Sequence, residues 1–188
     1  MRSHQRLART LAVILCFFVT CVCLAAEPAL APGTAFPRLT GKSLNGNEVV
    51  LPDASAGKPS LLILTFSKAA GDRSRKWTEQ FVKDFPDDSR ATSYSVAMLS
   101  SAPGFVRGMI RSAMKRGTPE KLRPRTVIVT SDDKPWKERI GVTNDKDPYL
   151  VLLDSKGKVV WMNHGEFNPK VLQHCEARIG ELESGAKK

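Results

Sequence analysis

Cysteine is scarce in this chain and lies almost entirely at one end. Of the four cysteines, only Cys175 lies beyond the first 26 residues, which hold the others, Cys16, Cys21 and Cys23. A single cysteine forms no intramolecular disulfide, and its spacing to His164 and His174 is not that of zinc ligands. The sequence therefore predicts no disulfide framework and no metal site, and nothing in it indicates a cofactor.

Other chemistry-bearing patterns are missing as well. No serine sits in a Gly-x-Ser-x-Gly elbow, so a triad of Ser74, a histidine and an aspartate is not supported. Acidic residues are few, with 19 Asp and Glu against 29 Lys and Arg, which gives a formal net charge of +10. Such a charge favours acidic partners or an anionic membrane surface. No nucleic-acid motif is visible, and we expect no nucleic-acid partner.

The first 26 residues have the three parts of a secretory signal peptide. Arg2, Arg6 and Arg9 make a basic start, residues 11–26 are apolar apart from Thr20, and small residues end the segment at Ala26. Sixteen residues are short for a membrane span, which needs about 20. We expect an exported protein, periplasmic or secreted, cleaved near Ala26. An uncleaved segment that tethers the protein to the membrane is the alternative, and a lipid-modified Cys21 or Cys23 is a weaker one.

The remaining chain is long enough for one domain with a sizeable core. Losing three arginines and no acid lowers the formal charge only to +7. Residues 27–37 are rich in proline and predict a linker or extended lead-in. The domain is expected over residues 38–183, followed by a short tail at 184–188.

Strands and helices alternate along that domain. A hairpin is predicted from residues 38–40 and 48–51 around Asn45-Gly46, then a buried strand at 61–66, a helix at about 74–84 and a strand at 94–99. A second helix is predicted at about 104–116, with an apolar face of Phe105, Val106, Met109, Ile110, Ala113 and Met114. A strand at 126–130, a hairpin from 149–153 and 159–162, and a helix capped by Asn168 with Pro169 at its first position complete the pattern.

This order resembles the thioredoxin-like superfamily, in the branch with an added N-terminal β-hairpin. The resemblance implies an α/β fold with a central mixed sheet flanked by helices. It sets Gly71-Asp72-Arg73-Ser74 at the four Cys-x-x-Cys positions of the active-site corner and Pro148 at the position of the cis-proline. Neither Gly71 nor Ser74 can form a thiolate, so thiol–disulfide exchange has no nucleophile at that corner.

Two cysteine-free branches resemble the chain more specifically. The segments at 70–74, 105–107 and 151–161, with Gly165, are similar to periplasmic YtfJ-type proteins. The segments at 64–68 and 152–154, with Asn144, Trp161 and Gly165, resemble the ATP10 family, whose members assist assembly of the ATP synthase membrane sector.

Two surfaces are candidates for binding. One is a groove comprising the Gly71–Ser74 corner, Arg75, Trp77 and the Pro148 loop, where the parent fold holds extended polypeptide. Cations crowd the predicted helix start, so it could also dock an anion on free N–H groups. The plain alternative is a loop in which Ser74 or Asp72 caps the helix.

The second surface is basic: Arg107, Arg111, Lys115 and Arg116, followed by further cations to Arg125. A solvated helix face is the default interpretation. A docking surface for an acidic partner or an anionic membrane is the alternative.

The predicted function is therefore non-enzymatic: an exported, thioredoxin-like factor that binds polypeptide and assists assembly in the cell envelope, with a protein partner that is acidic or membrane-proximal. The alternative is a thiol oxidoreductase or peroxidase that relies on Cys175. A purely structural envelope module is a third possibility. Cys175 lies in the apolar stripe of the last helix, where free cysteines are often simply buried.

Overall fold

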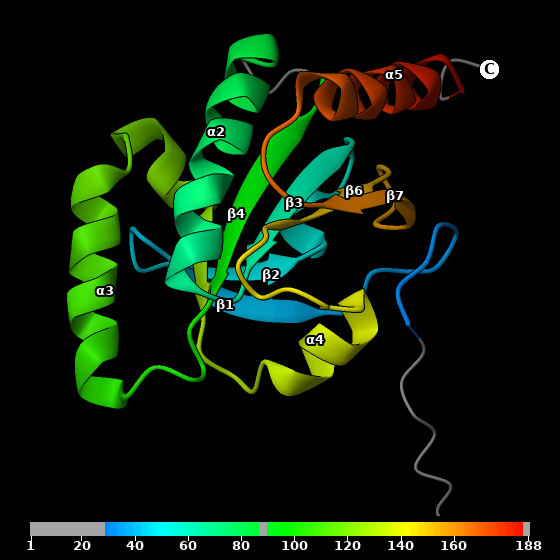
Figure 1. The fold of residues 1–188 in the computed structure, drawn as a ribbon. Helices are drawn as coiled ribbons and strands as arrows, with labels where there is room; N and C mark the ends of the chain where they lie inside the picture. Colours follow the sequence, from blue (N-terminus) through cyan, green and yellow to red (C-terminus); the bar gives the residue numbers. More distant parts are fainter. Residues whose placement is uncertain (1–28, 87–89, 186–188) are drawn as a thin grey trace, which may run out of the picture.

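A seven-stranded mixed sheet organises the protein, as the computed structural model shows for residues 29–86 and 90–185 (Figure 1). The predicted signal peptide lies outside the described residues. The strand order is β2-β1-β5-β4-β3-β6-β7. The strands are β1 (Leu39–Ser43), β2 (Glu48–Leu51), β3 (Ser60–Thr65), β4 (Thr92–Met98), β5 (Thr126–Val129), β6 (Tyr149–Leu153) and β7 (Val159–His164). The predicted α/β class with an N-terminal hairpin is confirmed.

The three central strands β3, β4 and β5 run parallel, and antiparallel hairpins extend the sheet on both sides. The β1–β2 hairpin turns at Gly46, whose φ of 94° suits glycine. All six residues of β3 are buried, as expected for a strand covered on both faces.

Helices cover both faces of this sheet. They are α2 (Lys68–Asp84), α3 (Gly104–Gly117), α4 (Lys134–Ile140) and α5 (Pro169–Gly185), with short 3-10 turns η2 (Asp53–Ser55) and η3 (Glu120–Arg125). Helices α2 and α5 pack on one face through Trp77, Phe81, Leu172, Cys175 and Ile179. Helix α4 covers the other face, opposite α5 in Figure 1, through Trp136 and Ile140.

The segment before the hairpin packs against the domain. Leu30 and Phe36 are buried in the core of the α4 face, and the Phe36 and Trp136 rings lie 5.4 Å apart. Backbone hydrogen bonds join Gly33 to Val159 and Phe36 to Gly157. This part of the proline-rich lead-in is therefore attached to the β6–β7 hairpin.

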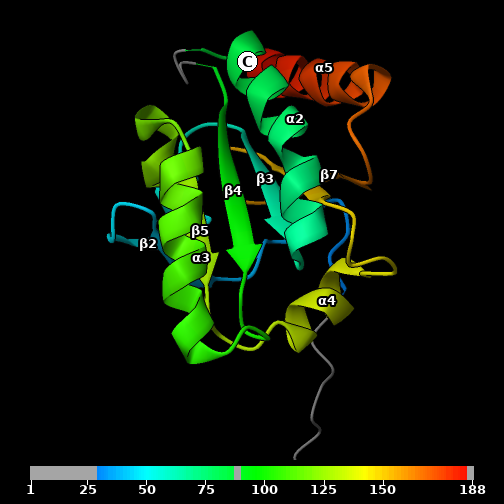
Figure 2. The same ribbon diagram turned by 60° about the vertical axis from the view of Figure 1, so that its left-hand side comes forward.

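Helix α3 differs from the others because none of its residues is buried. In Figure 1 it lies at the left-hand edge of the molecule, farther out than α2, and in Figure 2 β4 is seen between it and α2. The predicted apolar face is only partly correct: Val106, Ile110 and Met114 are half-buried, whereas Phe105 and Met109 point to solvent.

Candidate functional site

The ends of three strands meet beside the start of α2. In the register of the sheet, Leu64 of β3 pairs with Tyr149 at the start of β6, and Tyr149 pairs with His164 at the end of β7. The loop before β6 and the residues after β7 therefore lie next to the first turns of α2. This is the end of the sheet where the resemblance to the thioredoxin-like superfamily places the active-site corner.

Helix α2 begins earlier than predicted, so the corner is part of a helix and not of a loop. Ser67 is the N-cap of α2, because its hydroxyl oxygen accepts a hydrogen bond from the Ala70 N–H at 3.1 Å. Gly71-Asp72-Arg73-Ser74 consequently lies inside the helix rather than in a loop, and neither Asp72 nor Ser74 caps it. The Ser74 hydroxyl instead donates to the Gly71 carbonyl at 2.8 Å.

Two cations of the corner share one carboxylate. Lys68 and Arg75 both contact Asp72, at 2.9 and 3.0 Å. The hydrogen bond from Lys68, helped by the charges of Lys68 and Arg75, holds the pKa of the Asp72 carboxyl below its usual value. The anion-docking hypothesis set several cations against Asp72 alone, and the structure pairs Lys68 and Arg75 with that carboxylate while Ser67 caps the helix. Anion docking at this corner stays a prediction.

Arg73 joins α2 to the loop before β6. Its guanidinium donates to the Asp147 carboxylate at 2.6 Å and lies 3.3 Å from that of Glu166. The second Asp147 oxygen accepts from the Asn144 amide at 2.9 Å and lies 3.8 Å from Nδ1 of His164. We call Arg73, Asn144, Asp147, His164 and Glu166 the Asp147 cluster.

The loop itself is fixed at several points. Ser67 also donates to the Asp145 carbonyl at 2.7 Å, so the same hydroxyl caps α2 and anchors the loop. The Tyr149 hydroxyl accepts from the Thr143 and Asn144 N–H groups, and its ring stacks on His164 at 5.1 Å. The cluster is thus a rigid polar surface with both signs of charge.

Pro148 does not follow a cis peptide bond, which the resemblance had implied. The Asp147–Pro148 peptide bond is trans, and Leu51–Pro52 is the cis bond among residues 29–86 and 90–185. The Asn144 side chain accepts from the Lys146 N–H and donates to Asp147, which folds the loop into its own turn before Pro148. Pro148 is buried, and its carbonyl accepts from the Gly165 N–H.

The predicted groove residues are only partly available to a ligand. Trp77 is buried, with its indole N–H donating to the Gly165 carbonyl at 3.0 Å and its ring 5.1 Å from that of Phe167. Ser74 and Pro148 are buried as well, Gly71 and Arg73 are half-buried, and Asp72 and Arg75 are exposed. Sequence reasoning weighed His164 only as a zinc ligand and gave Asp147 no role. The turn chemistry of the stretch from Asn144 to Asp147 is the one local signal that could have pointed to this loop.

No nucleophile joins the Asp147 cluster. In the described part of the chain, the His164 side chain contacts Asp147 and Tyr149 but no serine or cysteine. Cys175 lies elsewhere, buried between α5 and the sheet. Burial, with a smaller contribution from the charge of Glu176, raises the pKa of its thiol to about 12. The cluster can hold polar groups, and no group in it is set up for covalent attack.

Two cavities lie away from this surface. A cavity of about 750 Å³ opens at the opposite end of β6, between the 57–59 loop, the 154–156 turn and the last residues of α5. A cavity of about 350 Å³ lies between α3 and η3, lined by Ser112, Lys115, Arg116 and Arg123. Two of the four residues of the predicted basic surface, Lys115 and Arg116, line the second cavity.

Solved structures share the fold at low sequence identity. The thioredoxin domain of a thiol-disulfide oxidoreductase from Bacteroides vulgatus is 22% identical, with a TM-score of 0.59 over 80% of this chain and 99% of that one. The thiol:disulfide interchange protein DsbE from Chlorobium tepidum is 19% identical, with a TM-score of 0.57 over 82% and 99%. A thiol peroxidase from Chromobacterium violaceum is 14% identical, with a TM-score of 0.54 over 81% and 89%.

These likenesses establish a thioredoxin-like fold for the chain. Among curated proteins, none matches its sequence. The resemblance to YtfJ-type proteins therefore stays a prediction. The family model described as ATP10 protein matches residues 31–178, which include every strand of the sheet and the whole Asp147 cluster. This chain belongs to the ATP10 protein family.

Proposed function

We propose that the protein is an exported assembly factor that holds a polypeptide at the Asp147 cluster without thiol chemistry. The observation that carries the proposal is the Arg73–Asp147 pair at 2.6 Å. The pair lies at the end of the sheet where thioredoxin-like oxidoreductases carry their thiols. In this chain, that end of the sheet presents an ion pair held by hydrogen bonds in place of reactive thiols. The resemblance to ATP10 factors supports an assembly role.

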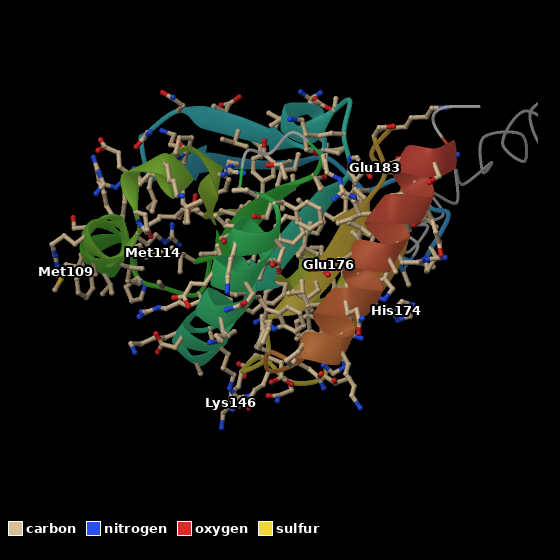
Figure 3. All side chains as sticks on the ribbon, turned by 90° about the horizontal axis from the view of Figure 1, so that it is seen from above. Met109, Met114, Lys146, His174, Glu176 and Glu183 are labelled. Carbon is tan, nitrogen blue, oxygen red and sulfur yellow. The ribbon has the colours of Figure 1, made fainter. Side chains whose placement is uncertain are left out.

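The surface around the cluster suits a peptide backbone and polar side chains. Glu166 and His164 are exposed beside the partly exposed Arg73, so donors and acceptors alternate across a small area. Exposed Lys146 extends it along the loop (Figure 3). Carboxylates and amides of a client can hydrogen-bond here, while the backbone beneath stays fixed by Ser67 and Tyr149.

The alternative based on Cys175 has little support in the structure. A thiol with a pKa of about 12 is almost wholly protonated at neutral pH, and the thiolate is the reactive form. The side chain is also buried. A reaction at Cys175 would need the α5 helix to move away from the sheet.

Export is proposed on the composition of residues 1–26. Within the described residues, no helix has the length and apolar character of a membrane span. Intact-mass measurement of the protein from its host's envelope tests this, with cleavage near Ala26 as the expected result. A chain that keeps residues 1–26 would support the membrane-tethered alternative.

Photo-crosslinking in the native envelope tests the client site. A crosslinking residue replaces Lys146 of the loop before β6, or Lys76, which is exposed on α2 three residues after Arg73 and lies over the Phe167 ring, or Glu48 on β2 as the control. Each variant is also made with Cys175→Ala. We expect positions 146 and 76 to capture the same polypeptide, position 48 not to, and Cys175→Ala to make no difference.

Capture at position 48 equal to that at 146 would contradict the proposed site. Capture or insulin reduction that disappears with Cys175→Ala would favour the oxidoreductase. If Arg73→Ala and Asp147→Ala leave both capture and the deletion phenotype unaffected, a structural module is the better description.

A further inference from the structure

Helix α3 exposes two large apolar side chains. Phe105 is 82% exposed and Met109 is 70% exposed, and they are the large hydrophobic residues that the described chain leaves in water. Figure 3 shows Met109 on the outer side of the helix, away from Met114, which lies toward the rest of the molecule. No other part of the described structure covers Phe105 and Met109.

The apolar pair continues along a single ridge of α3 into a polar half that ends in a cation. Phe105, Met109, Ser112 and Arg116 follow each other at intervals of four, three and four residues, which places them on the same side of a helix. The N-terminal half of this outer ridge is therefore apolar, and the C-terminal half is polar and positive.

The positive half forms a hollow with the next turn. Ser112, Lys115, Arg116 and Arg123 line the cavity of about 350 Å³ between α3 and η3. Arg123 is held in place because its Nε donates to the Thr118 carbonyl at 3.2 Å. Arg107, by contrast, donates to the carbonyls of Ser100 and Ala102 and fixes the start of the helix.

The charged side chains of α3 are all positive. α3 contains no acidic residue, and Glu120, 3.9 Å from Arg123, is the acid that borders the hollow among the described residues. By charge alone, a positive surface complements either an acidic protein or an anionic lipid surface. What favours lipid here is the pair of exposed apolar side chains beside the cations, because apolar and basic groups on one exposed helix are the chemistry of a helix that lies in a membrane interface.

We propose that α3 docks on an anionic phospholipid surface. Phe105 and Met109 enter the boundary between headgroups and acyl chains, and the Ser112–Lys115–Arg116–Arg123 hollow takes lipid phosphate. The two contributions act together, because either a short apolar contact or a few cations alone gives only weak membrane binding. The surface is separate from the Asp147 cluster, so the inference does not depend on the proposed client site.

Co-sedimentation with vesicles tests the proposal. The protein used is the processed form that is isolated from its host. The vesicles are phosphatidylcholine with equal phosphatidylglycerol, or phosphatidylcholine alone. We expect binding to the anionic vesicles only, weakened by added salt. Phe105→Ser with Met109→Ser should weaken it at least tenfold. Lys115→Gln with Arg116→Gln should weaken it more than tenfold, since each cation near such a surface contributes about fivefold.

A matched control variant distinguishes binding through α3 from non-specific attraction between a basic protein and anionic vesicles. Lys156→Gln with Lys170→Gln removes the same charge from exposed positions on the 154–157 turn and at the start of α5. It should reduce binding less than threefold. Far-ultraviolet circular dichroism and thermal unfolding should show the parent fold in all variants, since the substituted side chains are exposed.

Three outcomes would overturn the inference. These are no binding to anionic vesicles at low ionic strength, equal loss in the Lys156/Lys170 variant, or full binding by the Phe105/Met109 variant. A fluorophore on Met109→Cys gives an independent reading in protein that lacks residues 1–26 and so lacks Cys16, Cys21 and Cys23, because Cys175 is buried and stays unlabelled. Its emission should shift to the blue with anionic vesicles, and an unchanged spectrum would contradict insertion.

Discussion

Arg73 of α2 and Asp147 of the loop before β6 form a 2.6 Å ion pair between segments 74 residues apart in sequence. The Asp147 side chain is 14% exposed and the Arg73 side chain 36%. The pair is thus partly shielded from water, unlike the exposed pairs of Lys68 and Arg75 with Asp72.

Arg73→Ala should therefore lower the free energy of unfolding more than Arg75→Ala. We expect a loss of about 1–2 kcal/mol for Arg73→Ala, since Asp147 loses a charged hydrogen bond in a half-buried place. The exposed Arg75 pair should contribute less than about 0.5 kcal/mol. Urea unfolding of the two variants measures the difference, and equal losses would contradict the assigned role of the pair.

Gly71→Ala should stabilise the protein by about 0.5–1 kcal/mol, because Gly71 lies inside α2 and alanine is the better helix former. A Cβ at this position meets nothing within 4 Å. Gly41→Ala is the contrasting variant, since its Cβ would lie 2.6 Å from Val127 and 2.7 Å from the Ile128 carbonyl. Thermal unfolding should move up for the first and down for the second. A destabilised Gly71→Ala would mean that the residue is not helical.

Cys175 should react slowly with thiol reagents in the folded protein. At pH 8, a pKa of about 12 leaves roughly one thiolate in ten thousand, against about one in ten at the ordinary value of 9.0. Alkylation at pH 8 should be fast in urea and very slow without it. Rapid modification of the native protein would contradict the burial of this side chain.

The same shift predicts how stability depends on pH. The pKa of Cys175 is higher in the folded state than the ordinary 9.0, so above pH 9 the unfolded chain loses a proton that the folded chain keeps. The contribution of this group is thus present below pH 9 and is lost as the pH rises from 9 toward 12. Urea unfolding at pH 8 and pH 10 should show a larger decrease for the parent than for Cys175→Ala.

Trp77→Phe should lower the free energy of unfolding by about 2 kcal/mol. The substitution removes the hydrogen bond to the Gly165 carbonyl and leaves a small void under the Phe167 ring. Trp161→Phe, on the half-buried side of β7, should cost less than about 1 kcal/mol. Guanidinium titrations compare the two, and a reversed order would be inconsistent with a structural Trp77.

The sequence predicted the sheet better than the helices. The expected strand at 61–66 corresponds to β3 at Ser60–Thr65, because an apolar run between turn residues has few other solutions. The final helix begins at Pro169 as expected, and Asn168 accepts from the Lys170 N–H. Helix α4 was not predicted, although Asp133 before it, Pro135 within its first turn and Gly141 after it mark its ends.

The candidate site was harder to predict because it depends on distant contacts. Gly71 favoured a loop in local reasoning, whereas the Ser67 cap and its bond to Asp145 start the helix at Lys68 rather than at about residue 74. Nothing local shows that Arg73 meets Asp147. Periodicity likewise identified the apolar residues of α3 but not that Phe105 and Met109 lack a partner, since that depends on how far the helix lies from the sheet.

The burial of β3 determines how slowly its backbone amides exchange with solvent. The strand is paired on both sides and covered on both faces, so the amides of Leu62 and Ile63 should exchange with deuterium only when the whole domain unfolds. The amides of α3, where no residue is buried, should exchange through local opening. The helix that we assign to lipid can therefore adjust its tilt on a membrane while the strand leading to Ser67 keeps its shape.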